Sequence, residues 1–426
     1  MIEVMMRPET ELDLLRRLRQ LVLDKTTTYL DDLWLVPVDH YTDAERGQRE
    51  LTELLRREPV LAARSSDLAS PGSYLAVTLL GVRLLLVRQP DGSVRAMGNA
   101  CRHRGAQLVE DGGCGVANTF VCPYHGWRYG QDGRLSRVPH HFDSFVPMEK
   151  RMWGLVDYPV AERHGFIWAV PSPGGQMPDL GERLGALDAE FDAHRLAEWR
   201  LVRHETFDEA MNWKVVADGI LDPYHPEFVH PETVGRYINN NVYVFDTFSA
   251  AAARLVMSKR SIVSADLDTV ADNPSKYLFP NYLLLPNTFL VFQSRHFEVW
   301  TIEPHPSGDP QRSLTHIRIL TGPDMFASEE EHDSYVEENW QRFLQVGYTE
   351  DWGVARRVQK GVDNHSFTDT IVGRNEAPLH FFHTYIGDRL GDGQSGLRPL
   401  GDGPAPSDMT ADAVDARSAS TRTATP

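Results

Sequence analysis

The chain has 426 residues, with 43 Lys and Arg against 60 Asp and Glu, so its formal net charge is −17. Hydrophobic residues make up 41% and charged residues 24%, which excludes a disordered or collagen-like chain. The acidic balance excludes nucleic acid or an anionic membrane surface as the main partner. At about 150 residues per domain, the length predicts two or three domains.

Three features of the sequence bear on the cellular location of the protein. The sequence contains no run of about 18 apolar residues, so it predicts no transmembrane helix. The first 25 residues mix Glu11, Arg16 and Arg19 with leucines, a pattern unlike that of a secretory signal. The three cysteines cannot form a disulfide framework and suit a reducing compartment. We therefore expect a cytoplasmic protein.

The first 170 residues divide into a helical part and a β-rich part. Leucines at helical spacing predict an amphipathic helix over residues 9–23 and a second one over 44–57, so residues 1–58 are predicted to form an N-terminal helical segment. Over residues 59–170, short apolar runs alternate with glycine-containing turns such as Asp91-Gly92 and Asp132-Gly133. Closely spaced strands and turns of this kind predict a small all-β domain.

The remainder of the chain is predicted to be a mixed domain over residues 180–390, followed by a tail. Periodicity predicts strands at 243–256, 281–293, 297–304 and 314–321, and helices at 207–218, 328–345 and 350–360. Residues 391–426 are rich in Gly, Pro, Ser, Thr, Asp and Ala. We expect this tail to be disordered, because it buries too little surface to offset its ordering entropy.

Two short motifs in the β-rich part carry potential metal ligands. They are Cys101-Arg-His103 and Cys122-Pro-Tyr-His125, each of which places a thiolate and an imidazole in one tight turn. Two Cys and two His can hold one zinc ion, or a [2Fe–2S] cluster with both Cys on one iron and both His on the other. Zinc fingers of this composition usually carry both Cys on one side, whereas here each half has one Cys and one His. This distribution favours the cluster.

The residues around these ligands resemble a known family. The segments Asn99–Ala106 and Cys122–Tyr129 are similar to the CxHRG…CPxHGW motif of the Rieske domain of ring-hydroxylating oxygenases. The resemblance implies a Rieske [2Fe–2S] cluster bound by Cys101, His103, Cys122 and His125. Cys114 lies between the two motifs without a motif partner, and we expect no role for it in metal binding.

A second group of potential ligands lies between Asn212 and His230. Asp222 and His225 are three residues apart and share one face of a helical turn. His225 and His230 are five apart, about 140° from each other on an ideal helix, so joint ligation requires a broken helix. Pro223 and Pro226 supply such a break.

This segment resembles the NWK…DxYHxxxxH signature of the catalytic domain of the same family. The resemblance implies that His225 and His230 bind a mononuclear Fe(II), and that Asp222 links the two metal sites by accepting hydrogen bonds from His225 and from a cluster histidine of a neighbouring subunit. A 2-His-1-carboxylate site needs a third ligand. The family pattern favours Asp351 for this role over Glu350, Asp363 and Asp369, which stay open as candidates.

The resemblance also implies a fold class and an activity. The fold is expected to be α+β, with an N-terminal Rieske all-β domain followed by a helix-grip (START-like) catalytic domain with an antiparallel sheet and long helices. The protein is expected to be a terminal oxygenase that uses O₂ and electrons from a separate flavin- and NAD(P)H-dependent reductase, directly or through a ferredoxin. A head-to-tail homotrimer, with or without partner beta subunits, is implied as well.

The reaction and the substrate stay open at this point. Monohydroxylation, dihydroxylation and oxidative demethylation all use the same iron site. Residues near the motifs, and the sheet expected to face them, suggest an apolar pocket and hence an aromatic or other hydrophobic substrate. They are Asn212, Tyr224, Phe228, Asn287, Phe289 and Phe292. Two other functions remain: a Rieske-type electron carrier, and a non-enzymatic protein with structural zinc and a hydrophobic ligand cavity.

Overall fold

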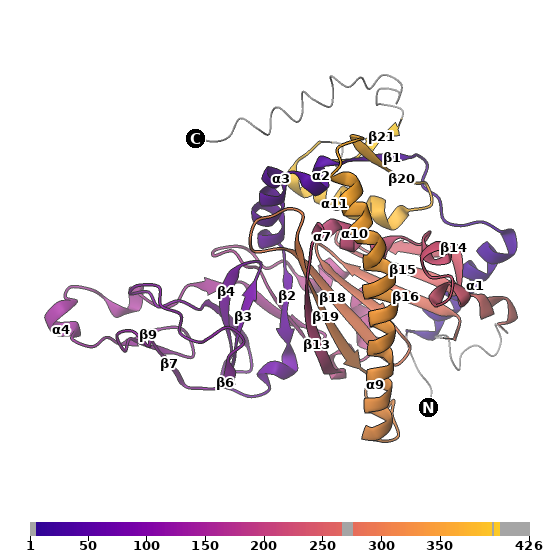
Figure 1. Ribbon diagram of the computed structural model, residues 1–426. Helices are drawn as coiled ribbons and strands as arrows, with labels where there is room; N and C mark the ends of the chain where they lie inside the picture. Colours follow the sequence, from indigo (N-terminus) through magenta and orange to yellow (C-terminus); the bar gives the residue numbers. More distant parts are fainter. Residues whose placement is uncertain (1–5, 266–275, 394–395, 401–426) are drawn as a thin grey trace. The chain divides into compact units, whose positions relative to one another are not determined.

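The computed structural model describes residues 6–265, 276–393 and 396–400, and they form two compact units (Figure 1). The first, the β unit, contains Thr52–Arg183 and Arg195–Trp199. The second, the mixed unit, contains the residues up to Leu51, then Leu184–His194, and the chain from Arg200 onward. No helix of the described residues is long and apolar enough to cross a membrane.

The β unit consists of three small antiparallel sheets, as the turn-rich sequence of residues 59–170 predicts. Their strand orders are β10-β5-β4-β3-β6, β11-β12-β2 and β7-β8-β9. The strands are β2 (Val60–Arg64), β3 (Ser73–Leu79), β4 (Val82–Arg88), β5 (Val94–Gly98), β6 (Cys114–Val116), β7 (Thr119–Val121), β8 (Arg128–Gly130), β9 (Leu135–Arg137), β10 (Asp157–Tyr158), β11 (Val160–Arg163) and β12 (Phe166–Ala169). A core cluster is shared by the first and third of these sheets, and it includes Leu85, Met97, Trp127 and Tyr129 together with the two motif cysteines.

The mixed unit is built on a seven-stranded antiparallel sheet in the order β13-β19-β18-β17-β16-β15-β14. Its strands are β13 (Arg200–Glu209), β14 (Ile238–Thr247), β15 (Ala252–Lys259), β16 (Leu278–Leu284), β17 (Thr288–Phe292), β18 (His296–Pro304) and β19 (Ser313–Thr321). The central strands β15, β17 and β18 are buried along almost their whole length. Burial on both faces explains the nearly continuous apolar sequence of β17, Thr-Phe-Leu-Val-Phe.

Helices cover one face of this sheet. Figure 1 shows α9 (Glu329–Phe343) and α10 (Trp352–Val362) as one long orange helix in front of the strands, joined through a π-helical segment, Leu344–Asp351. α10 packs on α7 (Trp213–Leu221), which in turn contacts β18 and β19 and also packs against α11 (Ala377–Leu390). An antiparallel sheet that holds a long helix confirms the predicted α+β class with a helix-grip catalytic domain.

Several of the predicted element bounds differ from those in the structure. Residues 207–209 belong to β13, and α7 begins only at Trp213 because the side chain of Asn212 accepts a hydrogen bond from the Lys214 amide as an N-cap. The single strands predicted at 243–256 and 281–293 are each two strands joined by a turn. The predicted helices at 328–345 and 350–360 run on into one another, since the π-helical segment keeps the backbone helical between them.

The N-terminal segment does not stand apart as a body of its own. Its first helix, α1 (Pro8–Asp24), matches the predicted helix and packs on β14 and β15 of the mixed unit. β1 (Trp34–Pro37) pairs with β20 (Asp369–Val372) and β21 (Arg398–Pro399). The short helices α2 (Asp39–Thr42) and α3 (Ala44–Arg49) follow, and then helical turns to Arg57.

The predicted disordered tail, 391–426, falls mostly outside the described residues. In the part that the structure describes, residues 396–400 include β21, which pairs with β1.

Candidate metal centres

In the β unit, the two Cys–His motifs form loops with the same backbone pattern. The Cys101 amide donates to the Ala106 carbonyl at 2.8 Å, and the Cys122 amide donates to the Trp127 carbonyl at 2.8 Å. In each loop, a glycine four residues after the cysteine returns a hydrogen bond to the cysteine carbonyl. Both glycines have positive φ, +74° for Gly105 and +69° for Gly126, a conformation that other residues rarely adopt. This requirement explains the glycine in each motif.

The loops place the sulfur and nitrogen ligands at different depths. Cys101 and Cys122 are 2% and 3% exposed and belong to the core, whereas His103 is half-buried and His125 is exposed. The two imidazole rings lie 4.6 Å apart between centroids, and His103 stacks on Trp127. The site therefore has a buried thiol end and an imidazole end near the surface.

The chemistry of these groups fits a [2Fe–2S] cluster. The buried Nδ1 atom of His103 has no hydrogen-bond partner among the described residues. Burial raises the pKa of the Cys101 thiol, while the hydroxyl of Tyr129, 3.3 Å from Sγ, opposes this shift. A cluster would give the orphaned nitrogen a ligand bond and the buried thiolates a compensating positive charge.

In the mixed unit, the break after α7 places two histidines side by side. α7 ends at Leu221, and α8 (Pro226–Val229) is a single turn with His225 just before it and His230 just after it. Gly235 then folds back over this turn and donates to the His230 carbonyl at 3.0 Å. A Cβ at Gly235 would lie only 2.6 Å from that oxygen, so only glycine fits there.

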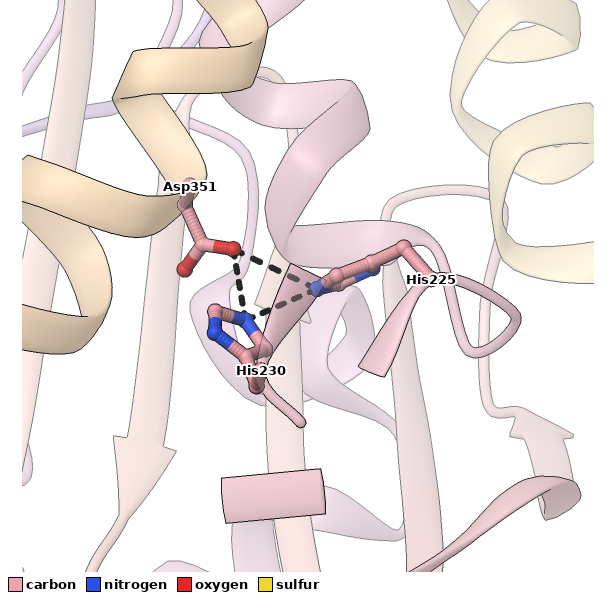
Figure 2. Close-up of side chains that lie close together, drawn as sticks. All are labelled: His225, His230 and Asp351. Atoms are coloured by element: carbon pink, nitrogen blue, oxygen red, sulfur yellow. Dashed lines mark hydrogen bonds and ion pairs between the residues drawn. The ribbon is translucent and has the colours of Figure 1, made fainter. Parts of the chain in front are cut away.

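The third member of the group comes from a distant part of the chain. Asp351 ends the π-helical segment between α9 and α10, and its carboxylate points toward the two imidazoles (Figure 2). Single π-helical turns inside α-helices are frequent at functional sites, because they turn a side chain away from the regular helical position. Here the turn directs Asp351 to the sheet side of the long helix.

The three donor atoms form a nearly equilateral triangle (Figure 2). Nε2 of His225 lies 3.2 Å from Nε2 of His230, and Oδ1 of Asp351 lies 3.3 Å and 2.8 Å from these two nitrogens. Adjacent ligands of an octahedral ion, each about 2.1 Å from the metal, lie about 3.0 Å apart. The triangle therefore has the size of one face of such an octahedron, the arrangement of a 2-His-1-carboxylate site.

The electrostatics of the triangle favour positive charge. Burial lowers the pKa of His225, but the carboxylates of Asp222 and Asp351 overcome this and raise it to about 10. Burial opposes ionisation of Asp351 as well, yet both histidines hold its pKa below the usual value. A divalent cation at this point would supply the charge that the carboxylates stabilise. The residues present thus fit a mononuclear iron.

The surrounding carboxylates have distinct positions. Glu350 accepts a hydrogen bond from Nδ1 of His230 at 2.6 Å and so contacts the nitrogen that faces away from the triangle. Asp222 accepts from the Tyr224 amide at 2.6 Å, while its other oxygen lies 3.6 Å from Nδ1 of His225, too far for the predicted hydrogen bond. The carboxylates of Asp363 and Asp369 accept hydrogen bonds from Gln359 and Thr368, respectively, and neither belongs to the triangle.

A cavity adjoins the triangle on the sheet side. His225, His230 and Asp351 line it together with residues of β15 to β18 and of the long helix. None of the six predicted pocket residues lines it. Tyr224 and Phe228 are 46% and 66% exposed, and Phe292 faces the opposite side of the sheet from its neighbours 291 and 293. Side-chain alternation along β17 accounts for Phe292, because its neighbours Val291 and Gln293 line the cavity.

Two more groups of titratable residues lie in the mixed unit. His383 contacts Oδ1 of Asp218 at 2.9 Å and the hydroxyl of Tyr41 at 3.3 Å in a buried network. Glu329, His332 and Asp333 also converge, but the guanidinium of Arg200 lies 3.0 Å from His332 and 3.3 Å from Glu329 and occupies the place of a cation.

Comparison with known protein families places both units. The family model described as "Rieske [2Fe-2S] domain" matches residues 58–147. The family model described as "Ring hydroxylating alpha subunit (catalytic domain)" matches residues 196–392. The chain therefore contains a Rieske [2Fe–2S] domain and the catalytic domain of a ring-hydroxylating alpha subunit. These two domains imply a Rieske [2Fe–2S] cluster and a mononuclear iron as cofactors.

Curated relatives of the chain act on different substrates. The oxygenase subunit of carnitine monooxygenase from Escherichia coli (strain K12) is 30% identical over 47% of this chain and 53% of its own length. The alpha subunit of chlorobenzene dioxygenase from Cupriavidus sp. (strain PS12) is 33% identical over 43% of this chain and 42% of its own. The chain thus spans about half the length of the curated relatives that it matches.

Solved structures share the fold over most of their length. A quaternary ammonium Rieske monooxygenase in complex with L-carnitine has a TM-score of 0.69 at 20% identity, over 86% of this chain and 96% of that one. Naphthalene 1,2-dioxygenase with bound indole has a TM-score of 0.65 at 19% identity, over 85% and 94%. Both likenesses confirm the fold class.

Proposed function

We propose that this protein is the terminal oxygenase of a Rieske-type system, which uses O₂ and externally supplied electrons to oxidise a hydrophobic organic substrate. The observation that carries the proposal is the triangle of His225, His230 and Asp351, which lies at a cavity in a chain that also contains a complete Rieske motif. An electron carrier or a zinc-containing binding protein has no use for the second metal site.

Each proposed ligand has a defined role. Cys101, Cys122, His103 and His125 would hold the cluster, and His225, His230 and Asp351 would hold the iron. When bound, the cluster would supply electrons and the iron would activate O₂. Because His225, His230 and Asp351 all line the cavity, a substrate bound in the cavity would lie next to the iron.

The residues around the triangle position it. Glu350 accepts a hydrogen bond from Nδ1–H of His230, which leaves the Nε2 lone pair free for the metal. Asp222 is proposed to couple the iron site to the cluster of a neighbouring subunit. Its carboxylate is fixed by the Tyr224 amide and lies near Nδ1 of His225, which is the nitrogen left for a second contact.

The proposed system has further partners. A separate NAD(P)H-dependent flavin reductase, directly or through a ferredoxin, would supply the electrons in the cytoplasm. We propose a homotrimer, with or without beta subunits, in which the cluster of one subunit serves the iron of the next. The substrate is proposed to be aromatic or otherwise largely hydrophobic, and its oxidation to be hydroxylation or oxidative demethylation.

The test is oxygen consumption by the iron-loaded protein with a surrogate reductase, NADH and a panel of aromatic and alkylamine compounds. Substrate-dependent uptake of O₂, with ¹⁸O from ¹⁸O₂ in the product or in the leaving aldehyde, is expected. Cluster reduction without any substrate-dependent uptake would support the electron carrier instead. A colourless protein that contains zinc would support the binding protein.

A further inference from the structure

The cavity beside the triangle contains a buried carboxylate that the proposed reaction does not use. Glu298 is 7% exposed and lines the cavity from the middle of β18. Its Oε2 atom accepts a hydrogen bond from Nε1 of Trp300 at 3.1 Å, and its Oε1 atom lies 3.7 Å from Nε2 of His296. Among the described residues, no Lys or Arg forms an ion pair with it. A carboxylate buried in this way calls for a positively charged or proton-donating partner.

His296 adds a second acceptor to this part of the cavity. The hydroxyl of Tyr335 donates a hydrogen bond to the Gln293 carbonyl at 3.1 Å. It therefore accepts a hydrogen bond from Nδ1 of His296 at 2.9 Å. When the imidazole is neutral, this contact places its proton on Nδ1. The Nε2 atom has no hydrogen-bond partner in the described part of the chain and belongs to a side chain only 1% exposed, so it presents a lone pair beside Glu298.

Asn281 provides a third acceptor in the same row of the sheet. It pairs in register with Val291, and Val291 pairs with Glu298, so the three side chains lie on one face of neighbouring strands. Asn281 is 5% exposed and lines the cavity, and no described residue donates a hydrogen bond to its Oδ1 atom. Glu298 accepts a hydrogen bond from the indole of Trp300. Within residues 6–265 and 276–393, neither Nε2 of His296 nor Oδ1 of Asn281 has a hydrogen-bond donor.

The other lining residues define the shape of the ligand. Phe279, Trp300 and Phe343 give the cavity an aromatic lining, which suits an apolar body and attracts a cation through the ring faces. Arg342, the guanidinium among the lining residues, is exposed and donates a hydrogen bond to Oδ1 of Asn339 at 3.1 Å. The inner wall is therefore anionic and accepting, and the basic group lies on an exposed side chain.

We propose that the substrate carries a protonated amine, whose N–H donates to Glu298 while its apolar body occupies the aromatic part of the cavity. The inference rests on the proposed function, since it names the substrate class of that site. Glu298 is then the main specificity-determining residue, with His296 and Asn281 as secondary acceptors. A quaternary ammonium, which has no N–H, satisfies only the charge and not the acceptors.

The experiment compares the binding of three ligands of nearly equal shape to the iron-loaded full-length protein. Benzyldimethylammonium carries charge and one N–H, benzyltrimethylammonium carries charge alone, and isobutylbenzene carries neither. Equilibrium dialysis measures the two cations and headspace partition measures the hydrocarbon. We expect benzyldimethylammonium to bind at least tenfold tighter than either of the others.

Two variants locate the effect. Glu298→Gln, which keeps the size of the side chain and its acceptor for Trp300, is expected to weaken binding of benzyldimethylammonium at least tenfold and to leave isobutylbenzene unchanged. Glu303→Gln is the matched control, because Glu303 lies on the same strand, outside the cavity, and contacts His316. It is expected to leave all three affinities unchanged.

The outcomes separate this proposal from the proposed function. Equal binding of isobutylbenzene and benzyldimethylammonium by the unaltered protein overturns the proposal, as does absence of ammonium binding. Equal binding of the two ammonium ions overturns N–H recognition, and this comparison needs no variant. Selective ammonium binding without any oxygen consumption would overturn the oxygenase function and leave the binding inference in place.

Discussion

The two ring nitrogens of His230 contact different carboxylates, and this difference separates the proposed iron ligand from a supporting residue. Nε2 lies 2.8 Å from Asp351 inside the triangle, whereas Nδ1 lies 2.6 Å from Glu350 outside it. In metal sites, the carboxylate on the second nitrogen orients the ring and raises its basicity without binding the ion. Asp351 and Glu350 are adjacent in sequence, so the distinction depends on where each carboxylate points.

Substitution of these two acidic residues should therefore have different effects on iron binding. Asp351→Ala is expected to abolish mononuclear iron, while Glu350→Gln should bind iron fully at saturation with about 10- to 100-fold lower affinity. Metal analysis together with the visible absorbance of the cluster measures both sites in one sample. Loss of iron from the Glu350→Gln protein but not from Asp351→Ala would exchange the two roles.

Asp222 is expected to act between the metals. Asp222→Asn should retain both metals but should slow reoxidation of the reduced cluster by at least tenfold in a single turnover with O₂ and substrate. The amide loses the negative charge that lies near Nδ1 of His225 and that helps to raise the pKa of this imidazole. Stopped-flow absorbance of the cluster measures the rate, and an unchanged rate would remove Asp222 from the electron path.

At the scale of elements, α7 is tied to the N-terminal segment by a buried ion pair. Nζ of Lys214 lies 2.5 Å from Oε2 of Glu50, which also accepts from Nε1 of Trp213 at 2.9 Å, and both charged side chains are almost completely buried. Arg46 binds the other oxygen of Glu50 at 3.0 Å. The Asn-Trp-Lys part of the motif thus serves the position of α7, from whose end the metal-binding turn leaves.

Removal of one partner of this ion pair should lower the free energy of unfolding. Glu50→Ala leaves Lys214 buried without a counter-charge and is expected to lower the free energy of unfolding by about 3–5 kcal/mol. The double variant Glu50→Leu/Lys214→Met should lose less than this, because no lone charge remains. Urea unfolding followed by tryptophan fluorescence measures both, with Glu45→Ala on exposed α3 as a control. Equal losses in the single and double variants would contradict the interpretation.

A buried histidine on the other face of the sheet should make the free energy of unfolding depend on pH. The hydroxyl of Tyr282 donates to Glu190 at 2.6 Å and so accepts from Nε2 of His194 at 2.9 Å. Burial lowers the pKa of His194 to about 3. A histidine that stays neutral when folded contributes full stability above its unfolded pKa of about 6.5, and this contribution is lost as the pH falls below that value.

Lowering the pH from 7.5 to 5.5 should therefore cost about 1.4 kcal/mol of unfolding free energy through His194 alone. His194→Gln keeps a donor for Tyr282 but does not titrate, so its stability should fall by that much less over the same range. Urea unfolding at the two pH values measures the difference. An identical pH dependence in both proteins would show that His194 is not buried in the neutral form.

At the scale of the whole molecule, the proposed trimer makes two inactive variants complement each other. Cys101→Ser is expected to lack the cluster and His225→Ala to lack the iron. In a mixed ring of three, one cluster-bearing subunit precedes one iron-bearing subunit, so about one third of the sites should work. Co-expression with two affinity tags and measurement of oxygen consumption tests this. Mixed oligomers that are as inactive as their parents would place both metals of one circuit in the same subunit.

Local sequence determined most of what is known of this protein. Both Cys–His loops are short, and their ligands and positive-φ glycines lie within six residues, so their pattern is readable along the chain. His225, His230 and the prolines that break the helix are equally local. The long helices and the strands at 297–304 and 314–321 were also predictable, since burial imposes its period on the sequence, whereas the turns inside 243–256 and 281–293 were not.

Only the tertiary structure decided what depends on distant contacts. Asp351 joins the histidines from more than a hundred residues away, and the π-helical turn that directs it leaves no sequence period of its own. The cavity wall of Asn281, His296 and Glu298 depends on the register of three strands and on which face the helices cover. Ligand types are a property of short segments, whereas the space that they enclose is a property of packing between segments, and that is fixed only when the chain is folded.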